Sequence, residues 1–193
     1  MMKRRATALL LATLAAANLT ACFPLVAGGV AAGTMVATDR RTSGAYVEDQ
    51  SIELKGMQAI GERYPAAHVN VTSYNRAVLL TGEAADEAQR SAIELQLRGM
   101  PNVRRIYNHM VVAPSSSLPQ RNGDTWLTTK VRTRLLQGNG YPPTGIKVVS
   151  ERGVVYLMGL VTQDEGDAAA KVAAATSGVL QVVTLFEPLS TQP

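Results

Sequence analysis

Apolar and polar positions along this chain form one pattern that occurs twice. Residues 69–82 align without gaps with residues 146–159, and in both segments an apolar/polar alternation is followed by a short polar turn and a second apolar run. The alignment continues through residues 86–98 against residues 163–175. A match that extends over several elements indicates an internal duplication, and this duplication sets the architecture.

Each copy begins with a segment of helical periodicity. In the second copy, Leu127, Val131 and Leu135 recur every four residues, which predicts an amphipathic helix, and Asp124 is its expected N-cap. The matching helix of the first copy is expected over residues 48–61. A β-hairpin follows in both copies, and its second strand is expected to end at a glycine, Gly82 or Gly159, with a positive φ or close packing.

The second half of each copy predicts another helix and a closing strand. Thr162 and Glu165 have the spacing of a capping box in front of an alanine-rich helix. The closing strand is expected over residues 103–112 or 179–186. Each unit is therefore α-β-β-α-β, an α+β fold in which a three-stranded mixed sheet carries two helices on one face.

These patterns divide the chain into two repeats. We place the first repeat at residues 48–113, a Pro/Ser-rich linker at 114–123, and the second repeat at 124–190. Units of roughly 65 residues are near the lower limit for independent folding, so docking of one repeat on the other would stabilise both.

The N-terminus has the pattern of an export signal. Lys3, Arg4 and Arg5 precede an apolar run that ends close to Cys22, the only cysteine. The run is short for a transmembrane span, which needs about 20 residues. It looks like a bacterial lipoprotein signal with its lipobox, which implies that residues 1–21 are removed, that Cys22 is acylated, and that residues 22–47 link lipid to domain. By resemblance to enterobacterial sorting rules, Phe23 after the cysteine favours the outer membrane.

Charge changes the picture less than the composition suggests. The formal net charge is +4, but residues 1–21 carry three of these units, and a chain that begins at Cys22 has a net charge of +1. The basic character therefore does not indicate nucleic-acid binding, and any basic patch must be local.

The two copies differ in their first helices. Residues 48–61 carry a net charge of −2, whereas residues 124–137 carry +2 together with Trp126, the only tryptophan. Helical geometry places Lys130 on the same face as Trp126 and Arg134 at its edge. Tryptophan beside cations is typical of a membrane interface, where the indole lies at headgroup level. The alternative is that Trp126 packs in the core.

The lipobox, the paired units and the Asp124-Thr125-Trp126 motif together resemble the dual BON-domain outer-membrane lipoproteins, over essentially the whole exported chain. The resemblance implies a periplasm-facing, monomeric protein that binds anionic phospholipid (phosphatidylglycerol or cardiolipin), maintains outer-membrane integrity, and is linked to the β-barrel assembly machinery and to division sites. The contact positions that it implies are Trp126, Thr129, Lys130 and Val131, with Arg134 added from helix geometry alone.

No catalytic constellation is apparent, and we expect neither an enzyme nor a cofactor or metal. His68 and His109 lack the spacing of a metal site and are expected to be solvated or bonded locally. Paired acidic residues such as Asp86 and Glu87 lie at helix starts, where they serve as caps. Two alternatives remain beside phospholipid binding: a protein-binding adaptor that uses the same basic helix, and a periplasmic osmotic-stress protein.

Overall fold

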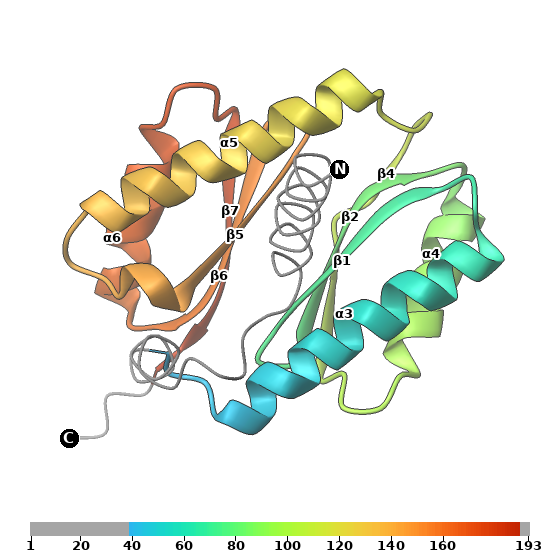
Figure 1. Cartoon of the computed structure of the whole chain (residues 1–193), viewed down its shortest axis with the longest axis horizontal. Helices are drawn as coiled ribbons and strands as arrows, with labels where there is room; N and C mark the ends of the chain where they lie inside the picture. The colour runs from blue at the N-terminus through green and yellow to red at the C-terminus, as the bar shows by residue number, and fades with distance from the viewer. Residues whose placement is uncertain (1–38, 190–193) are drawn as a thin grey trace, which may run out of the picture. The chain divides into compact units, whose positions relative to one another are not determined.

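The computed structural model describes residues 39–189, which fall within one compact unit. Both repeats form the predicted α-β-β-α-β order (Figure 1). The elements of the first repeat are α3 (Ser43–Arg63), β1 (His68–Tyr74), β2 (Ala77–Ala84), α4 (Glu87–Arg98), β3 (Arg105–Asn108) and β4 (Val111–Val112). Those of the second are α5 (Leu118–Gln137), the short 3-10 helix η2 (Pro143–Gly145), β5 (Ile146–Glu151), β6 (Val154–Val161), α6 (Gln163–Ala174) and β7 (Gln181–Pro188).

Each repeat contains the expected mixed sheet. β1 pairs antiparallel with β2, and β5 pairs antiparallel with β6. The closing strands run parallel to the central ones: β7 lies along β6, while β3 and β4 lie along β2. The closing strand of the first repeat is interrupted at His109 and Met110, so that it forms two pieces rather than the single strand expected.

An aspartate from the first helix holds the hairpin turn in both repeats. The turn residues have positive φ, with Asn75 at 50° and Arg76 at 65° in the first repeat. Asp49 accepts hydrogen bonds from both of their backbone N–H groups, each at 2.7 Å. Asp124 does the same for the second turn, at 2.9 and 3.0 Å. The two aspartates that align in the sequence therefore perform one structural task.

The prediction that Asp124 caps α5 was wrong, and the physical reason is this contact with the turn. α5 begins at Leu118, and its N-cap is Ser117, which forms a capping box with Gln120. Residues 118–123, expected to be linker, therefore belong to the helix. α3 likewise begins at Ser43, upstream of the expected residue 48, with Thr42 as its N-cap. The capping box of Thr162 and Glu165 is confirmed.

The two glycines expected to end the second strands lie inside them. Gly82 has a φ of +103°, and a Cβ there would approach the carbonyl oxygen of His68 to 2.1 Å. A Cβ on Gly159 would lie 3.0 Å from the carbonyl oxygen of Gly145. The strands continue to Ala84 and Val161. Glycine is needed here for close backbone approach, with a positive φ at Gly82 only.

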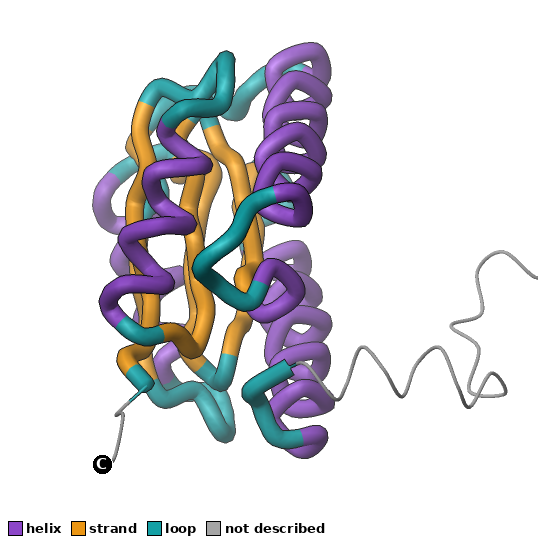
Figure 2. Tube along the Cα trace, turned by 90° about the vertical axis from the view of Figure 1, so that its left-hand side faces the viewer, coloured by secondary structure: helices purple, strands orange, loops and turns teal. Residues whose placement is uncertain are grey.

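Three apolar clusters stabilise the described residues. In each repeat one face of the sheet packs against its two helices, as predicted. The opposite faces of the two sheets pack on each other, and this third cluster joins Tyr74 and Leu79 of the first repeat to Tyr156, Met158 and Leu185 of the second. Figure 2 shows the strands with helices packed beside them. The two repeats are therefore docked through their sheets.

Polar contacts surround this shared cluster. The hydroxyl of Tyr74 donates to the carbonyl oxygen of Gly145 at 2.8 Å. Arg104 donates to both carboxylate oxygens of Glu187 at 2.7 Å. Just before α3, Arg40 forms two hydrogen bonds with Glu165, at 2.6 and 2.8 Å, and these hold the pKa of Glu165 down at about 2.

No helix among residues 39–189 is long and apolar enough to cross a membrane. The predicted signal sequence and the predicted acylation site, Cys22, lie outside the described residues, as does the first part of the expected linker.

Candidate functional site

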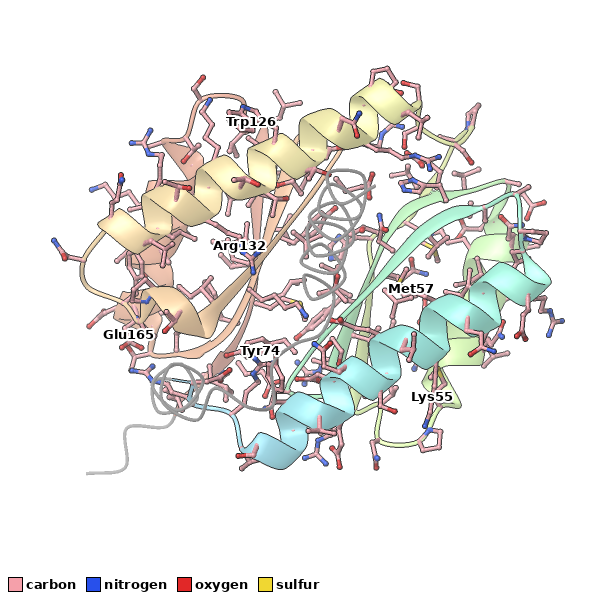
Figure 3. All side chains as sticks on the ribbon, in the orientation of Figure 1. Lys55, Met57, Tyr74, Trp126, Arg132 and Glu165 are labelled. Atoms are coloured by element: carbon pink, nitrogen blue, oxygen red, sulfur yellow. The ribbon has the colours of Figure 1, made fainter. Side chains whose placement is uncertain are left out.

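The face of α5 that carries Trp126 is exposed. Leu127, Val131 and Leu135 point into the helix–sheet core, whereas the side chain of Trp126 is 70% exposed, so the alternative of a core tryptophan is excluded. Trp126 and Arg132 lie on different sides of the helix (Figure 3). Val131 is completely buried. Its predicted contact with lipid was therefore wrong, because it belongs to the apolar stripe of the helix.

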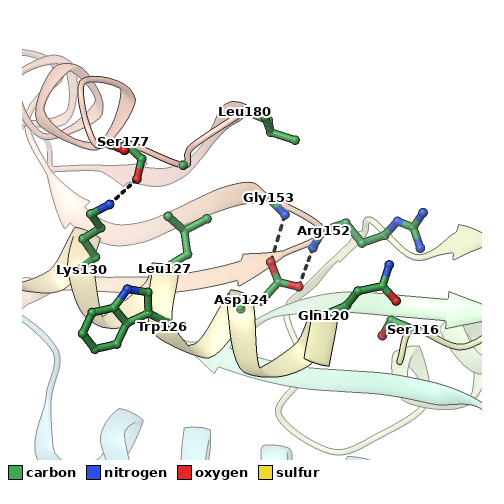
Figure 4. Close-up of a pocket in the computed structure, with 12 residues that line it drawn as sticks. Ser116, Gln120, Asp124, Trp126, Leu127, Lys130, Arg152, Gly153, Ser177 and Leu180 are labelled. Atoms are coloured by element: carbon green, nitrogen blue, oxygen red, sulfur yellow. Dashed lines mark hydrogen bonds between the residues drawn. The ribbon is translucent and has the colours of Figure 1, made fainter. Parts of the chain in front are cut away.

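Trp126 borders an open groove of about 510 Å³, which we call the α5 groove. Four segments form it: the residues just before α5, α5 itself, the β5–β6 turn, and the loop between α6 and β7 (Figure 4). Its lining residues are Ser116, Gln120, Gly123, Asp124, Trp126, Leu127, Lys130, Arg152, Gly153, Ser177, Gly178 and Leu180.

The predicted cations Lys130 and Arg134 have partners at the end of α6. Lys130 Nζ donates to the carbonyl oxygen of Ser177 at 2.8 Å, and Arg134 Nη1 donates to that of Ala175 at 3.3 Å. Cations at this position neutralise carbonyl groups at the negative end of a helix dipole. Thr129 is exposed, and its hydroxyl donates to the carbonyl oxygen of Thr125. Lys130 therefore has a structural role in addition to lining the groove.

Sequence reasoning missed three residues of this region. Leu180 is 81% exposed at the rim of the α5 groove, and Leu118 is 71% exposed at the start of α5. Arg152 lines the groove from the hairpin turn. Leu180 and Arg152 could have been found from the duplication itself, by asking which aligned positions change chemical character.

The same place in the first repeat is closed by charged side chains. The counterparts of Gly123 and Gly153 are Glu48 and Arg76, and these form an ion pair at 3.5 Å. The counterpart of Leu180 is Arg104, whose guanidinium is held by Glu187 and by the carbonyl oxygen of Asn75. Gly123 therefore leaves open space where the first repeat has Glu48, whereas the side chain of Leu180 packs over Gly153.

A buried polar cluster lies between the repeats, close to the α5 groove. One ring nitrogen of His68 and one carboxylate oxygen each of Glu83 and Glu151 lie within 4.8 Å of one another. Glu83 accepts from His68 Nδ1, from the backbone N–H of Ser116 and from Arg152, and these bonds together lower its pKa although burial raises it. Burial raises the pKa of Glu151. His68 is thus bonded locally, as expected.

Comparison with known proteins identifies the class. The sequence profile of the BON domain matches residues 48–114 and 123–187, one match for each repeat. The chain is therefore a protein with two BON domains. It is 36% identical to the outer membrane lipoprotein DolP of Haemophilus influenzae over 174 residues, which cover 89% of this chain and 90% of that protein. It belongs with that protein to the dual BON-domain DolP family.

Two further relatives extend the comparison. The 21 kDa hemolysin of Actinobacillus pleuropneumoniae is 30% identical over 77% of this chain and 78% of its own length. The osmotically-inducible protein Y of Escherichia coli is 27% identical over 78% of each chain. Together these relatives identify the chain as a BON-domain envelope protein.

Proposed function

We propose that this protein is an outer-membrane lipoprotein, anchored through Cys22 and facing the periplasm, that binds anionic phospholipid through the α5 groove and thereby helps to maintain outer-membrane integrity. The observation that carries the proposal is the open groove of the second repeat, where an exposed tryptophan, an exposed leucine and cations gather, while the first repeat fills the same place with ion pairs. The outer-membrane location rests on the predicted lipobox and on the name of the Haemophilus relative.

Two exposed apolar side chains favour contact with a membrane. Trp126 on α5 and Leu180 on the loop between α6 and β7 both belong to the rim of the α5 groove. Large apolar side chains exposed together on one surface mark an interaction site. The indole ring has its lowest free energy at the level of the lipid headgroups, where its apolar body and its N–H are both satisfied.

The charges around the α5 groove favour an anionic ligand. Lys130 and Arg152 line the groove, Arg134 lies one turn further along α5, and the carboxylate of Asp124 is occupied by two backbone N–H groups. Each cation near an anionic membrane contributes about 1 kcal/mol. The hydrogen bonds of Lys130 and Arg134 to the end of α6 leave their charges in place for this attraction.

Vesicle flotation tests the proposal. Because residues 39–189 form a compact unit with its own apolar clusters, the test uses a chain that begins at Phe23, without the signal and the acyl chains. We expect binding to vesicles that contain phosphatidylglycerol and little binding to pure phosphatidylcholine. The double variant Trp126→Ala with Lys130→Glu should lose at least tenfold in affinity, by about 1 kcal/mol for each lost charge interaction and more for the indole.

A matched control lies on α3 of the first repeat. Lys55 is the counterpart of Lys130, and Met57 is 52% exposed nearby. The double variant Met57→Ala with Lys55→Glu makes the same change of charge and should bind like the wild type. Equal losses in both double variants would contradict the proposal. If neither variant nor headgroup charge matters, the protein-adaptor function, in which the same cations meet an acidic protein such as a component of the β-barrel assembly machinery, becomes the better explanation.

A further inference from the structure

Arg152 belongs to two sites at once. It lines the α5 groove, and its Nη1 lies 3.2 Å from Oε1 of Glu83, which is in the first repeat. The side chain of Arg152 is 46% exposed, whereas that of Glu83 is completely buried. The guanidinium therefore lies where the groove meets the polar cluster between the repeats.

Glu83 does not depend on Arg152 alone. Its Oε2 accepts from His68 Nδ1 at 2.9 Å and from the backbone N–H of Ser116 at 3.1 Å. If the guanidinium moves away, the carboxylate keeps both of these donors. Only the Arg152 side of this 3.2 Å pair is exposed, at 46%, so water can solvate the guanidinium when it leaves the buried carboxylate.

The backbone of Arg152 is fixed while its side chain has a choice of partners. Its N–H donates to Asp124 Oδ2 at 2.9 Å, and the next residue, Gly153, donates to Oδ1. Only the side chain has to rotate for the guanidinium to turn toward the groove. A guanidinium binds phosphate oxygens through two parallel hydrogen bonds, which gives it a geometric advantage over lysine.

We propose that Arg152 exchanges its partner, Glu83, for the phosphate of an anionic phospholipid seated in the α5 groove. This inference rests on the proposed function and deepens it, because it makes Arg152 a headgroup contact. It also means that headgroup binding releases one ion pair between the two repeats, so lipid occupancy and the docking of the repeats are coupled. Glu83 then acts as a competitor that weakens lipid binding.

A double-mutant cycle on vesicle binding tests the exchange. The chain that begins at Phe23 is titrated with phosphatidylglycerol vesicles. We expect Arg152→Gln to weaken binding about fivefold and Arg152→Lys to restore part of the loss. Glu83→Gln frees the guanidinium and should tighten binding about two- to fivefold. In the Arg152→Gln background, Glu83→Gln should give no gain. Arg105→Gln, an exposed arginine on β3, is the control with the same charge change and should bind like the wild type.

Two results overturn the inference. One is wild-type binding by Arg152→Gln. The other is a gain from Glu83→Gln that persists without Arg152, since this would be a general effect of charge. If Trp126→Ala with Lys130→Glu abolishes binding while the Arg152 variants do not, the proposed function stands and only this inference fails. If that double variant binds normally, the proposed function itself fails.

Two further measurements keep the test decisive. If Glu83→Gln fails to fold, the NMR resonance of the Arg152 Nε–Hε group in the wild type provides the test. We expect it to shift on addition of phosphatidylglycerol and to stay fixed with phosphatidylcholine. A resonance that stays fixed with both lipids overturns the exchange. Soluble glycerol phosphate distinguishes a free phosphate from a lipid. We expect millimolar glycerol phosphate to leave vesicle binding unchanged, and full competition would overturn the assignment to a membrane lipid.

Discussion

The two repeats share one fold but differ in the space between the first helix and the hairpin turn, which is closed in the first repeat and open in the second. In the first repeat, Glu48 and Arg76 pair across the space between the first helix and the hairpin turn. In the second, both positions are glycine: Gly123 has open space beside it, the side chain of Leu180 packs over Gly153, and the α5 groove lies open with Trp126 at its rim. At this corner the first repeat thus has an internal ion pair and the contact of Arg104 with Glu187, whereas the second repeat has an open groove.

The aspartates that hold the turns allow the strongest test of this comparison. Asp49 is completely buried and accepts from Ser73, from Arg41 and from two backbone N–H groups. Asp124 is partly exposed and accepts only from the turn. Asp49→Ala should lower the free energy of unfolding by about 3–5 kcal/mol, because it leaves buried donors unpaired, and Asp124→Ala by about 1–3 kcal/mol. Urea unfolding monitored by circular dichroism measures both; equal losses would show that the two turns are held alike.

Closing the α5 groove should make the second repeat behave like the first. A Cβ on Gly123 meets nothing within 4 Å, so Gly123→Glu fits without a clash. The new carboxylate repels anionic headgroups, and we expect binding to phosphatidylglycerol vesicles to weaken about five- to tenfold. The fold should gain slightly in stability, because glycine inside a helix costs up to about 1 kcal/mol.

Gly61 provides the matched control for that substitution. It also lies on a first helix, and a Cβ there again meets nothing within 4 Å. Gly61→Glu changes the net charge equally and should leave vesicle binding as in the wild type. A similar loss in both variants would mean that overall charge, and not the α5 groove, governs binding.

The last residue of the first strand differs between the repeats, since Glu151 of β5 corresponds to Tyr74 of β1. Burial raises the pKa of Glu151 above its ordinary value of 4.5, and the charges of Glu83 and Asp124 raise it further. The ionised form is thus disfavoured in the folded state, so this residue costs stability above its folded pKa and nothing below its unfolded pKa. Glu151→Gln should raise Tm by a few degrees at pH 8, with a gain that vanishes below pH 4.5. A constant gain at every pH would contradict the assignment.

The smallest change in stability is expected for Trp126→Ser, which replaces the tryptophan with the residue found at its counterpart, Ser51. Because the indole is 70% exposed, Trp126→Ser should change the free energy of unfolding by no more than about 0.5 kcal/mol. Ser51→Trp should not give the first repeat any affinity for vesicles, since Glu48 and Arg76 still fill the space beside it. A large drop in Tm for Trp126→Ser would mean that this side chain has a structural role.

Much of the fold could be predicted because the duplication shows each element twice. The alternation in β5, the four-residue spacing on α5 and the capping box at Thr162 are local signals, and all three match the structure. The start of α5 could not be predicted in this way. Asp124 has the side chain of an N-cap, but its carboxylate accepts from a turn 28 residues away, which no local pattern reveals.

The candidate site was predicted only in part for a related reason. Helical spacing placed Trp126 and Lys130 on one face of α5, and both line the α5 groove. Helical spacing did not lead us to separate Val131, which is buried, from its exposed neighbours. It also could not predict that Leu180 and Arg152, which belong to other elements, line the groove. These contacts depend on how α5 packs against its sheet.

The sequence by itself determined the duplication and the order of elements in each repeat, because these follow from periodicity and from residues close together in the chain; the BON-domain class followed from the resemblance of its motifs to a known family. Only the tertiary structure decided that the sheets dock face to face, that an aspartate holds each turn, and that one groove is open while an ion pair closes its counterpart. Such features depend on distances between residues far apart in the chain, which the order of amino acids does not state directly.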